Sequence, residues 1–279
     1  MIEGTPLAER LWDLLSHEDE GTRLQGGELL AMYPELAPGL ARRLEVVVQD
    51  GTTATIRPSV HAATLLARHV PVRIPQGMLS VHSSELEGTE RLKGLTQLWV
   101  QGGEDFEVRR MRELEDLRCV GQARTIGGPG PSLRRASVRV PQSELGLWRG
   151  LIELNLKLEG PVTASELRLL DGDYETMGLF SLTGELLPCL PRARSVWLDE
   201  WTLEAALLGR AGELLRLEFC AVTGDEVRLS WRRIHAVETT WPTVFLGPEV
   251  EEARFEDCAD VVVVAHPNTL VEGAEVRRA

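Results

Sequence analysis

The chain has 279 residues, of which 43% are apolar and 26% charged, and its net charge is -13. Nucleic acids and anionic membrane surfaces select cationic stripes, so this acidic balance argues against both as partners. The longest apolar run of note, Val261 to Ala265, is far shorter than the roughly 20 residues that span a bilayer. The N-terminal segment lacks the pattern of a signal peptide, and the four cysteines lie far apart. We therefore expect a reduced, cytoplasmic protein.

Four short amphipathic helices are predicted in the N-terminal part of the chain, positions 1–75. Thr5 and Pro6 form a typical helix start, and leucines follow at helical spacing. The other three helices are predicted at about residues 20–32, from Pro38 to before Gly51 with Leu40, Leu44, Val47 and Val48 on one face, and at about 59–69. This pattern indicates a stack of α-helical hairpins, with a domain boundary between residues 75 and 76.

The second predicted helix carries the elements of a known helical repeat. An Asp, an Arg, a small residue and a Leu follow one another there, as Asp19, Arg23, Gly27 and Leu30. In this order they resemble HEAT repeats, and the match covers about one and a half repeats. A helical cap that only shields the end of a repeat array explains the same residues.

A second pattern begins near residue 92. In four segments an apolar residue is followed three and five positions later by two more, and the segments recur at a nearly constant period of roughly 20 residues. The segments are Leu95-Leu98-Val100, Leu114-Leu117-Cys119, Leu133-Ala136-Val138 and Leu151-Leu154-Leu156. The last two apolar residues of each segment flank a middle residue that faces the other side of a strand. Parallel strands are therefore predicted, each the neighbour of the next.

The strand pattern continues beyond Leu158 with uneven spacing. A short helical run, capped by Thr202 and ended by Gly209, is predicted between two of the later strands. Those strands are predicted at residues 167–169, 180–182, 196–198, 217–219, 227–229, 237–239, 253–255 and 261–263.

This repeat resembles the leucine-rich repeats, whose pattern is L-x-x-L-x-L-x-x-N/C-x-L over about 20 to 29 residues. The resemblance, to irregular bacterial members, implies an α/β protein. An N-terminal α-helical hairpin stack (1–75) would precede a solenoid with a parallel β-sheet (76–279). The family's Asn ladder is missing, because the chain holds only Asn155 and Asn268. Another group must satisfy the turns. A plainer β-solenoid, or a twisted parallel sheet with irregular links, is the alternative.

Catalytic and metal-binding motifs are scarce. The six histidines are scattered, and the segment 127–132 lacks the N–H donors and the Lys of a phosphate loop. Asp171 and Asp173 lack the other ligands of a calcium loop. The arginine-rich segment 109–139 is interpreted as a mixed solvated face, because six nearby acidic residues leave an excess of only +2. We expect no cofactor and no metal.

The middle residues of the strands are the candidate binding residues. If their neighbours face the core, the middle residues share the inner face of the repeat sheet. They are Trp99, Arg118, Ser137, Asn155, Arg168, Ser181, Trp197 and Glu218. Trp and Arg are enriched at interface hot spots, which makes this face a candidate protein-binding surface. Alternatively, the two Trp side chains cover the sheet edge or pack under a loop.

Two classes of function follow from these patterns. The first is a non-enzymatic interaction module, such as an adaptor, a regulatory subunit or an immunity-type protein, with a protein partner that the net charge of -13 suggests is basic. The second is a small-ligand-binding protein or hydrolase-type enzyme whose site is assembled only in three dimensions. The repeat and the Trp/Arg set favour the first class.

Overall fold

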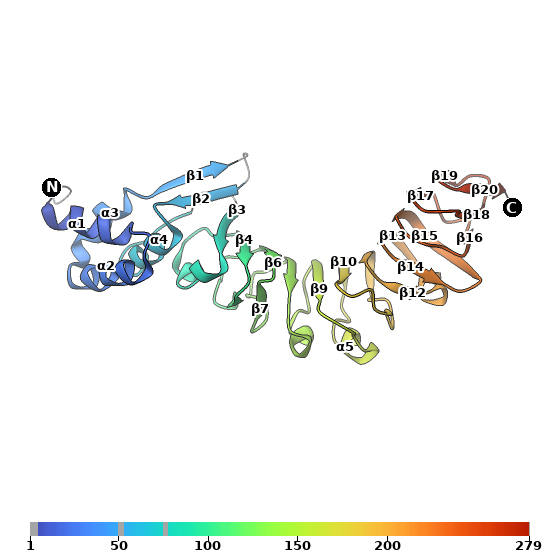
Figure 1. Ribbon diagram of the computed structural model, residues 1–279, viewed down its shortest axis with the longest axis horizontal. Helices are drawn as coiled ribbons and strands as arrows, with labels where there is room; N and C mark the ends of the chain where they lie inside the picture. The colour runs from blue at the N-terminus through green and yellow to red at the C-terminus, as the bar shows by residue number, and fades with distance from the viewer. Residues whose placement is uncertain (1–4, 50–52, 75–77, 279) are drawn as a thin grey trace. The chain divides into compact units, whose positions relative to one another are not determined.

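The structure is a computed structural model that describes residues 5–49, 53–74 and 78–278. It is a mixed α/β structure, in which helices come first along the chain and mostly parallel strands follow (Figure 1). Met1–Leu133 and Arg134–Ala279 form two compact units. The domain boundary expected between residues 75 and 76 lies outside the described residues.

Short helices open the described part of the first unit. Thr5 caps the first, its Oγ1 accepting the N–H of Ala8 at 3.3 Å, and Asp19 caps the second, its Oδ2 accepting the N–H of Thr22 at 2.7 Å. The helices are α1 (Pro6–Leu15), α2 (Glu20–Met32), α3 (Ala37–Ala41) and α4 (Val60–Leu66), with a 3-10 turn η1 (Pro34–Leu36). Gly27 allows α2 to approach α4 closely, because a Cβ there would lie 2.9 Å from Leu65 Cδ2.

The third predicted helix is wrong beyond Ala41. Glu45–Gln49 form strand β1, which pairs antiparallel with β2 (Thr53–Arg57) and places Val46 opposite Ile56. The run Val46–Val48 is β-branched throughout, and such residues favour strands over helices. The local preference of these valines therefore outweighs their helical spacing.

Parallel strands then follow at a constant interval. Leu79, Leu98 and Leu117 lie opposite one another on successive strands, and all three are fully buried, so each step across the sheet advances the chain by the same length. The strands are β3 (Met78–His82), β4 (Gln97–Gly102) and β6 (Asp116–Gly121). Two 3-10 turns, η2 (Ser83–Glu85) and η3 (Thr89–Arg91), lie in the link between β3 and β4. Two short strands, β5 (Asp105–Glu107) and β7 (Arg124–Ile126), follow β4 and β6 and pair with each other. The predicted pairing of strands 98–100 and 117–119 is confirmed.

The second unit is built on parallel strands in chain order, which we call the main sheet. It contains β8 (Arg135–Arg139), β9 (Glu153–Leu158), β10 (Tyr174–Ser181), β11 (Ala193–Asp199), β13 (Ala211–Glu218), β15 (Glu226–Val237), β17 (Glu252–Glu256) and β19 (Leu270–Glu272). The predicted pairing of strands 136–138 and 154–156 is confirmed. The steps from β10 to β17 have equal length along the chain, whereas the step from Leu154 on β9 to Met177 on β10 is longer.

Two smaller ladders accompany the main sheet. In one, β16 (Thr243–Leu246) pairs with the first half of β15, followed by β18 (Val262–Ala265) and β20 (Glu275–Arg278); in the other, β12 (Thr202–Glu204) pairs with β14 (Ala221–Thr223). The helical links η4 (Gln142–Leu147), α5 (Ala164–Arg168) and η5 (Ala205–Gly209) lie between strands. No helix in the described ranges has the length and apolar character of a bilayer-spanning segment.

Main-sheet strands end at turns that recur once per repeat. The turning residues, all with left-handed φ, are Glu200, Phe219, Glu238 and Asp257. Behind them Cys220, Thr239 and Cys258 stack. The Thr239 hydroxyl donates to Val237 O at 3.0 Å and accepts the N–H of Cys220 at 3.4 Å, while Cys258 Sγ accepts the N–H of Thr239 at 3.4 Å. This Cys–Thr–Cys stack satisfies backbone groups at the turns.

Several sequence predictions in this unit are wrong. The predicted strand 237–239 does not extend beyond Val237, where β15 ends and Glu238 turns with a left-handed φ. The predicted strand 217–219 ends at Glu218, and Phe219 is 52% exposed at the turn. Residues 167–169 are not a strand: α5 ends at Arg168, after a capping box in which Thr163 and Glu166 bond reciprocally. The predicted strand 180–182 has its faces reversed, because Ser181 is buried, while Phe180 is half-buried on the other face. Because the step into β10 is longer than the others, the spacing of the earlier strands does not predict this register. The helical run at 205–209 begins after Glu204 rather than at Thr202.

Candidate functional site

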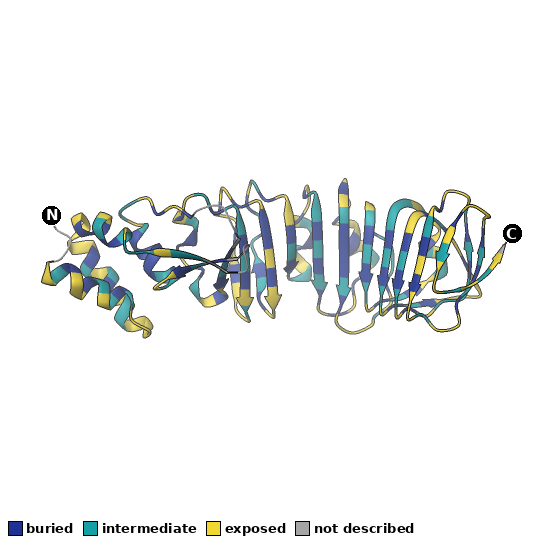
Figure 2. Cartoon of the chain, turned by 90° about the horizontal axis from the view of Figure 1, so that it is seen from above, coloured by how far each residue is buried: buried dark blue, intermediate teal, exposed yellow. Residues whose placement is uncertain are grey.

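One side of the main sheet is the core of the second unit, and the other side, which we call the open face, carries the candidate site. Buried residues alternate with less buried ones along the strands, as Figure 2 shows. On the core side Leu154, Met177 and Val196 lie in register and are almost completely buried. On the open face the central row is formed by Asn155, Gly178, Trp197, Arg216, His235, Arg254 and Glu272.

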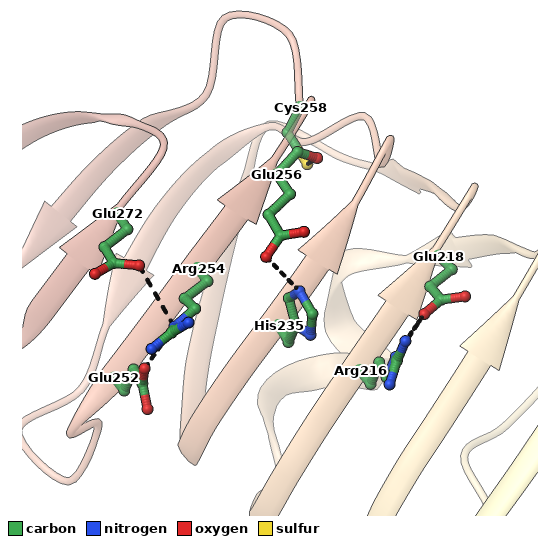
Figure 3. Close-up of polar contacts among 8 residues, drawn as sticks. All are labelled: Arg216, Glu218, His235, Glu252, Arg254, Glu256, Cys258 and Glu272. Carbon is green, nitrogen blue, oxygen red and sulfur yellow. Dashed lines mark hydrogen bonds and ion pairs between the residues drawn. The ribbon is translucent and has the colours of Figure 1, made fainter.

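Trp197 is the centre of an aromatic and ionic cluster on the open face. Its ring and that of Phe180 form a T-shaped pair, with 4.8 Å between centroids and an interplanar angle of 69°. Arg216 lies over the indole, with its guanidinium carbon 4.5 Å from the ring centroid, and is ion-paired with Glu218 (Figure 3). Neighbours on both adjacent strands thus hold the half-buried indole in one orientation.

Gly178 makes room for this cluster. A Cβ at Gly178 would lie 2.2 Å from Asn155 Oδ1 and 2.8 Å from Phe180 Cε2, so both side chains lean over the glycine. Asn155 Oδ1 and Trp197 Nε1 are buried, and neither has a hydrogen-bond partner among the described residues. An unmet acceptor and an unmet donor therefore lie on either side of Gly178 in the central row.

Asp199 adds an acidic group to the cluster. It lies opposite Glu218 on the neighbouring strand, and its Oδ1 has no hydrogen-bond partner in the described part of the chain. Burial raises the pKa of Asp199 above its ordinary value, the carboxylates of Glu218 and Glu200 raise it further, and Arg216 opposes them. The single Arg216 thus serves two acidic side chains and leaves the cluster with uncompensated negative charge.

The row continues beyond Arg216 as a chain of paired polar side chains. His235 Nε2 lies 3.1 Å from Glu256 Oε1, and Arg254 Nε lies 2.6 Å from Glu252 Oε1 and 3.4 Å from Glu272 Oε2 (Figure 3). These side chains satisfy one another in solvent, where such pairs contribute little stability. The chemically unsatisfied part of the open face is therefore the cluster of Asn155, Phe180, Trp197, Asp199, Arg216 and Glu218, here called the Trp197 cluster.

Comparisons with known proteins identify no relative of this chain. The chain matches no protein-family model, no curated protein and no solved structure. Within the described ranges, no three His, Cys, Asp or Glu side chains gather so that they would hold a metal ion. The case for a site therefore depends on the geometry of the chain's own residues.

The structure brings together three of the six binding residues expected from the sequence. Asn155, Trp197 and Glu218 belong to the Trp197 cluster. Trp99 and Arg118 lie opposite each other in the first unit, where Trp99 is half-buried and Arg118 is exposed and 3.5 Å from Asp116 Oδ1. Arg168 is wrong as a strand residue, since it lies at the end of α5.

Sequence reasoning missed Phe180, Asp199 and Arg216. Arg216 follows Trp197 by one step of the repeat, so the repeat itself was a signal for it. Asp199 likewise precedes Glu218 by one step. Phe180 was missed because the longer link before β10 displaces that strand from the earlier spacing.

Proposed function

We propose that this protein is a non-enzymatic interaction module, a leucine-rich-repeat-like solenoid that binds a protein partner through the Trp197 cluster. The solenoid is supported by parallel strands at equal steps along the chain and by the stack of Cys220, Thr239 and Cys258 behind the turns. A cytoplasmic adaptor, regulatory subunit or immunity-type protein fits such a module.

The proposal depends mainly on the orientation of the Trp197 indole and on its N–H group. Its indole is preorganised between Phe180 and Arg216, and its buried N–H has no partner among the described residues. Buried indole N–H groups usually find an acceptor, and Trp and Arg dominate interface hot spots. A partner that covers this cluster would supply that acceptor and exclude water from the indole.

The chemistry of the cluster favours a basic group on the partner. Asp199 has an unpartnered oxygen and lies opposite Glu218, so an incoming Lys or Arg side chain would relieve the repulsion between two carboxylates. The net charge of -13 would also speed the encounter with a basic protein.

The test begins with a pull-down from native cell extract, followed by calorimetry with the purified partner. Trp197→Ala is expected to cost about 2 kcal/mol or more of binding free energy, as hot-spot truncations do. Arg254→Ala is the matched control, because Arg254 lies in the same row but is already paired with Glu252 and Glu272. Its expected effect is below about 0.5 kcal/mol.

Trp99→Ala combined with Trp197→Ala asks whether the first unit shares in binding. A further loss beyond that of Trp197→Ala would assign Trp99 to the interface. Unchanged affinity of the double variant, with a native circular dichroism spectrum, would contradict the proposed interface altogether.

A further inference from the structure

A cluster of arginines that the proposed function does not use lies in the first unit, on the link between β5 and β6. Val108 and Met111 anchor this link, being 0% and 4% exposed, and the N–H of Met111 donates to Val108 O at 2.9 Å. The turn between these two buried residues holds Arg109 and Arg110, and Arg112 follows it; all three arginines are exposed. Burial of the anchors therefore directs three guanidinium groups to the surface.

The two aspartates close in sequence are paired with other arginines. Asp105 is bound by Arg124, with Nη2 to Oδ2 at 2.8 Å, and Asp116 lies 3.5 Å from Arg118. No ion pair joins Arg109, Arg110 or Arg112 to another described residue. The small excess of charge counted along the sequence thus becomes a local cluster of unpaired cations.

A cavity of about 480 Å³ adjoins the cluster. Its charged lining includes four cations, Arg91, Lys93, Arg110 and Arg112, and two carboxylates, Glu90 and Glu113. The cations outnumber the carboxylates: Glu90 lies 3.8 Å from Arg91 Nε, and Glu113 Oε2 accepts the N–H of Gly94 at 2.6 Å, which leaves Lys93, Arg110 and Arg112 facing one carboxylate. The cavity is therefore a positively charged pocket in a strongly acidic chain.

The same pocket has an apolar wall. Leu92, Leu95 and Met111 line it, and each is at most 4% exposed. Its volume lies in the range of about 300–1,000 Å³ that small-molecule sites occupy. A second cavity of about 520 Å³, lined by Glu107, Arg109, Arg110 and Arg112, shares two of these arginines. Arg110 and Arg112 thus line both cavities.

We infer that this pocket binds a small phosphorylated molecule, with Arg110 and Arg112 contacting the phosphate. A single carboxylate engages one guanidinium in bidentate fashion, whereas a phosphate offers three acceptor oxygens and about two charges. Several unpaired cations around one cavity therefore match a phosphate, which accepts more hydrogen bonds and carries more negative charge than a carboxylate. This ligand site is independent of the Trp197 cluster.

Titration calorimetry on the full chain, with inorganic pyrophosphate as the probe and constant ionic strength, tests the inference. Saturable binding is expected, and Arg110→Ala combined with Arg112→Ala is expected to weaken it at least tenfold. Arg135→Ala with Arg194→Ala is the matched control. It removes the same charge from two exposed arginines of the second unit, each of which has a glutamate partner. This control is expected to bind pyrophosphate as the native chain does.

A conservative double variant and a second anion provide two further tests. Arg110→Lys with Arg112→Lys keeps the charge and is expected to bind with intermediate affinity, which separates loss of contact from loss of fold. Citrate, a tricarboxylate, is expected to bind more weakly than pyrophosphate. Absence of saturable pyrophosphate binding, equal weakening in the control pair, or citrate binding as tight as pyrophosphate would overturn the inference.

Discussion

The guanidinium of Arg216 lies 4.5 Å from the ring centroid of Trp197, and the same side chain is ion-paired with Glu218, further along its own strand. One arginine therefore links an aromatic ring on the neighbouring strand to a carboxylate on its own. Such a link holds the indole in place before any partner arrives. Preorganisation of this kind reduces the entropy lost on association.

Replacing Arg216 is expected to destabilise the fold modestly. Arg216→Ala removes a cation–π contact worth about 0.5–1 kcal/mol and leaves Glu218 facing Asp199 without its counterion. We expect a loss of about 1 kcal/mol in the free energy of unfolding, measured by urea denaturation. Arg254→Ala, on the same face, should lose less than about 0.5 kcal/mol. Equal losses in the two variants would show that the stack with Trp197 adds nothing.

A side chain at Gly178 is expected to disturb the cluster through Asn155. In Gly178→Ala the new Cβ would lie 2.2 Å from Asn155 Oδ1, so Asn155 and Phe180 must both move. Overpacking of this kind typically costs about 1–3 kcal/mol. Adding Asn155→Ala to Gly178→Ala should recover part of that loss, and a double-mutant cycle of urea unfolding measures the coupling. Strictly additive effects of the two changes would contradict this packing.

Truncation of the core side of the sheet is expected to be much more costly. Leu98, Leu117, Leu154 and Leu156 are all 0% exposed, as the alternation of the strands predicted. Leu154→Ala should therefore cost about 2–5 kcal/mol through lost burial and a new cavity. Leu182→Ala is the control, since Leu182 is 47% exposed and should lose less than about 1 kcal/mol. A small loss in both variants would mean that the sheet relaxes around the cavity.

The sequence predicted the four strands at 98–100, 117–119, 136–138 and 154–156, whose spacing is nearly constant. Alternation identifies the buried face of a strand because successive side chains point to opposite sides, and the constant step carries that assignment from Leu98 to Leu117. The assignment failed at β10, where the longer step includes helix α5. The pattern Thr163-x-x-Glu166 is the sequence signature of a capping box and was a usable signal for this helix.

Contacts between different steps of the repeat were less predictable. Cys220, Thr239 and Cys258 recur at the repeat interval, yet only the structure shows that they bond to backbone groups at the turns. Arg109 and Arg110 were interpreted as part of a mixed solvated face. Both are exposed, and Asp105, the nearest Asp in sequence, is bound to Arg124 through a neighbouring ladder. Charge counts along a chain do not record which partner each carboxylate has.

Asp199→Asn is expected to stabilise the fold while weakening partner binding. Burial and the neighbouring carboxylates raise the pKa of Asp199, so its stabilising contribution is fully present below the unfolded-state pKa and is lost as pH rises through the folded-state pKa. Near neutral pH the charged Asp199 thus lowers stability, and the neutral amide removes that cost. Urea unfolding should show the variant more stable than the native chain near about pH 7, with the difference shrinking toward about pH 4.

Asp105→Asn provides a control of opposite sign. The hydrogen bond from Arg124 lowers the pKa of Asp105, so its stabilising contribution is present above the unfolded-state pKa and is lost as pH falls. This variant should therefore be no more stable than the native chain near neutral pH.

A merely structural role for Asp199 predicts that stability and affinity change in the same direction. Higher stability together with weaker binding of the basic partner is the result that distinguishes a binding carboxylate, and unchanged affinity would remove Asp199 from the interface.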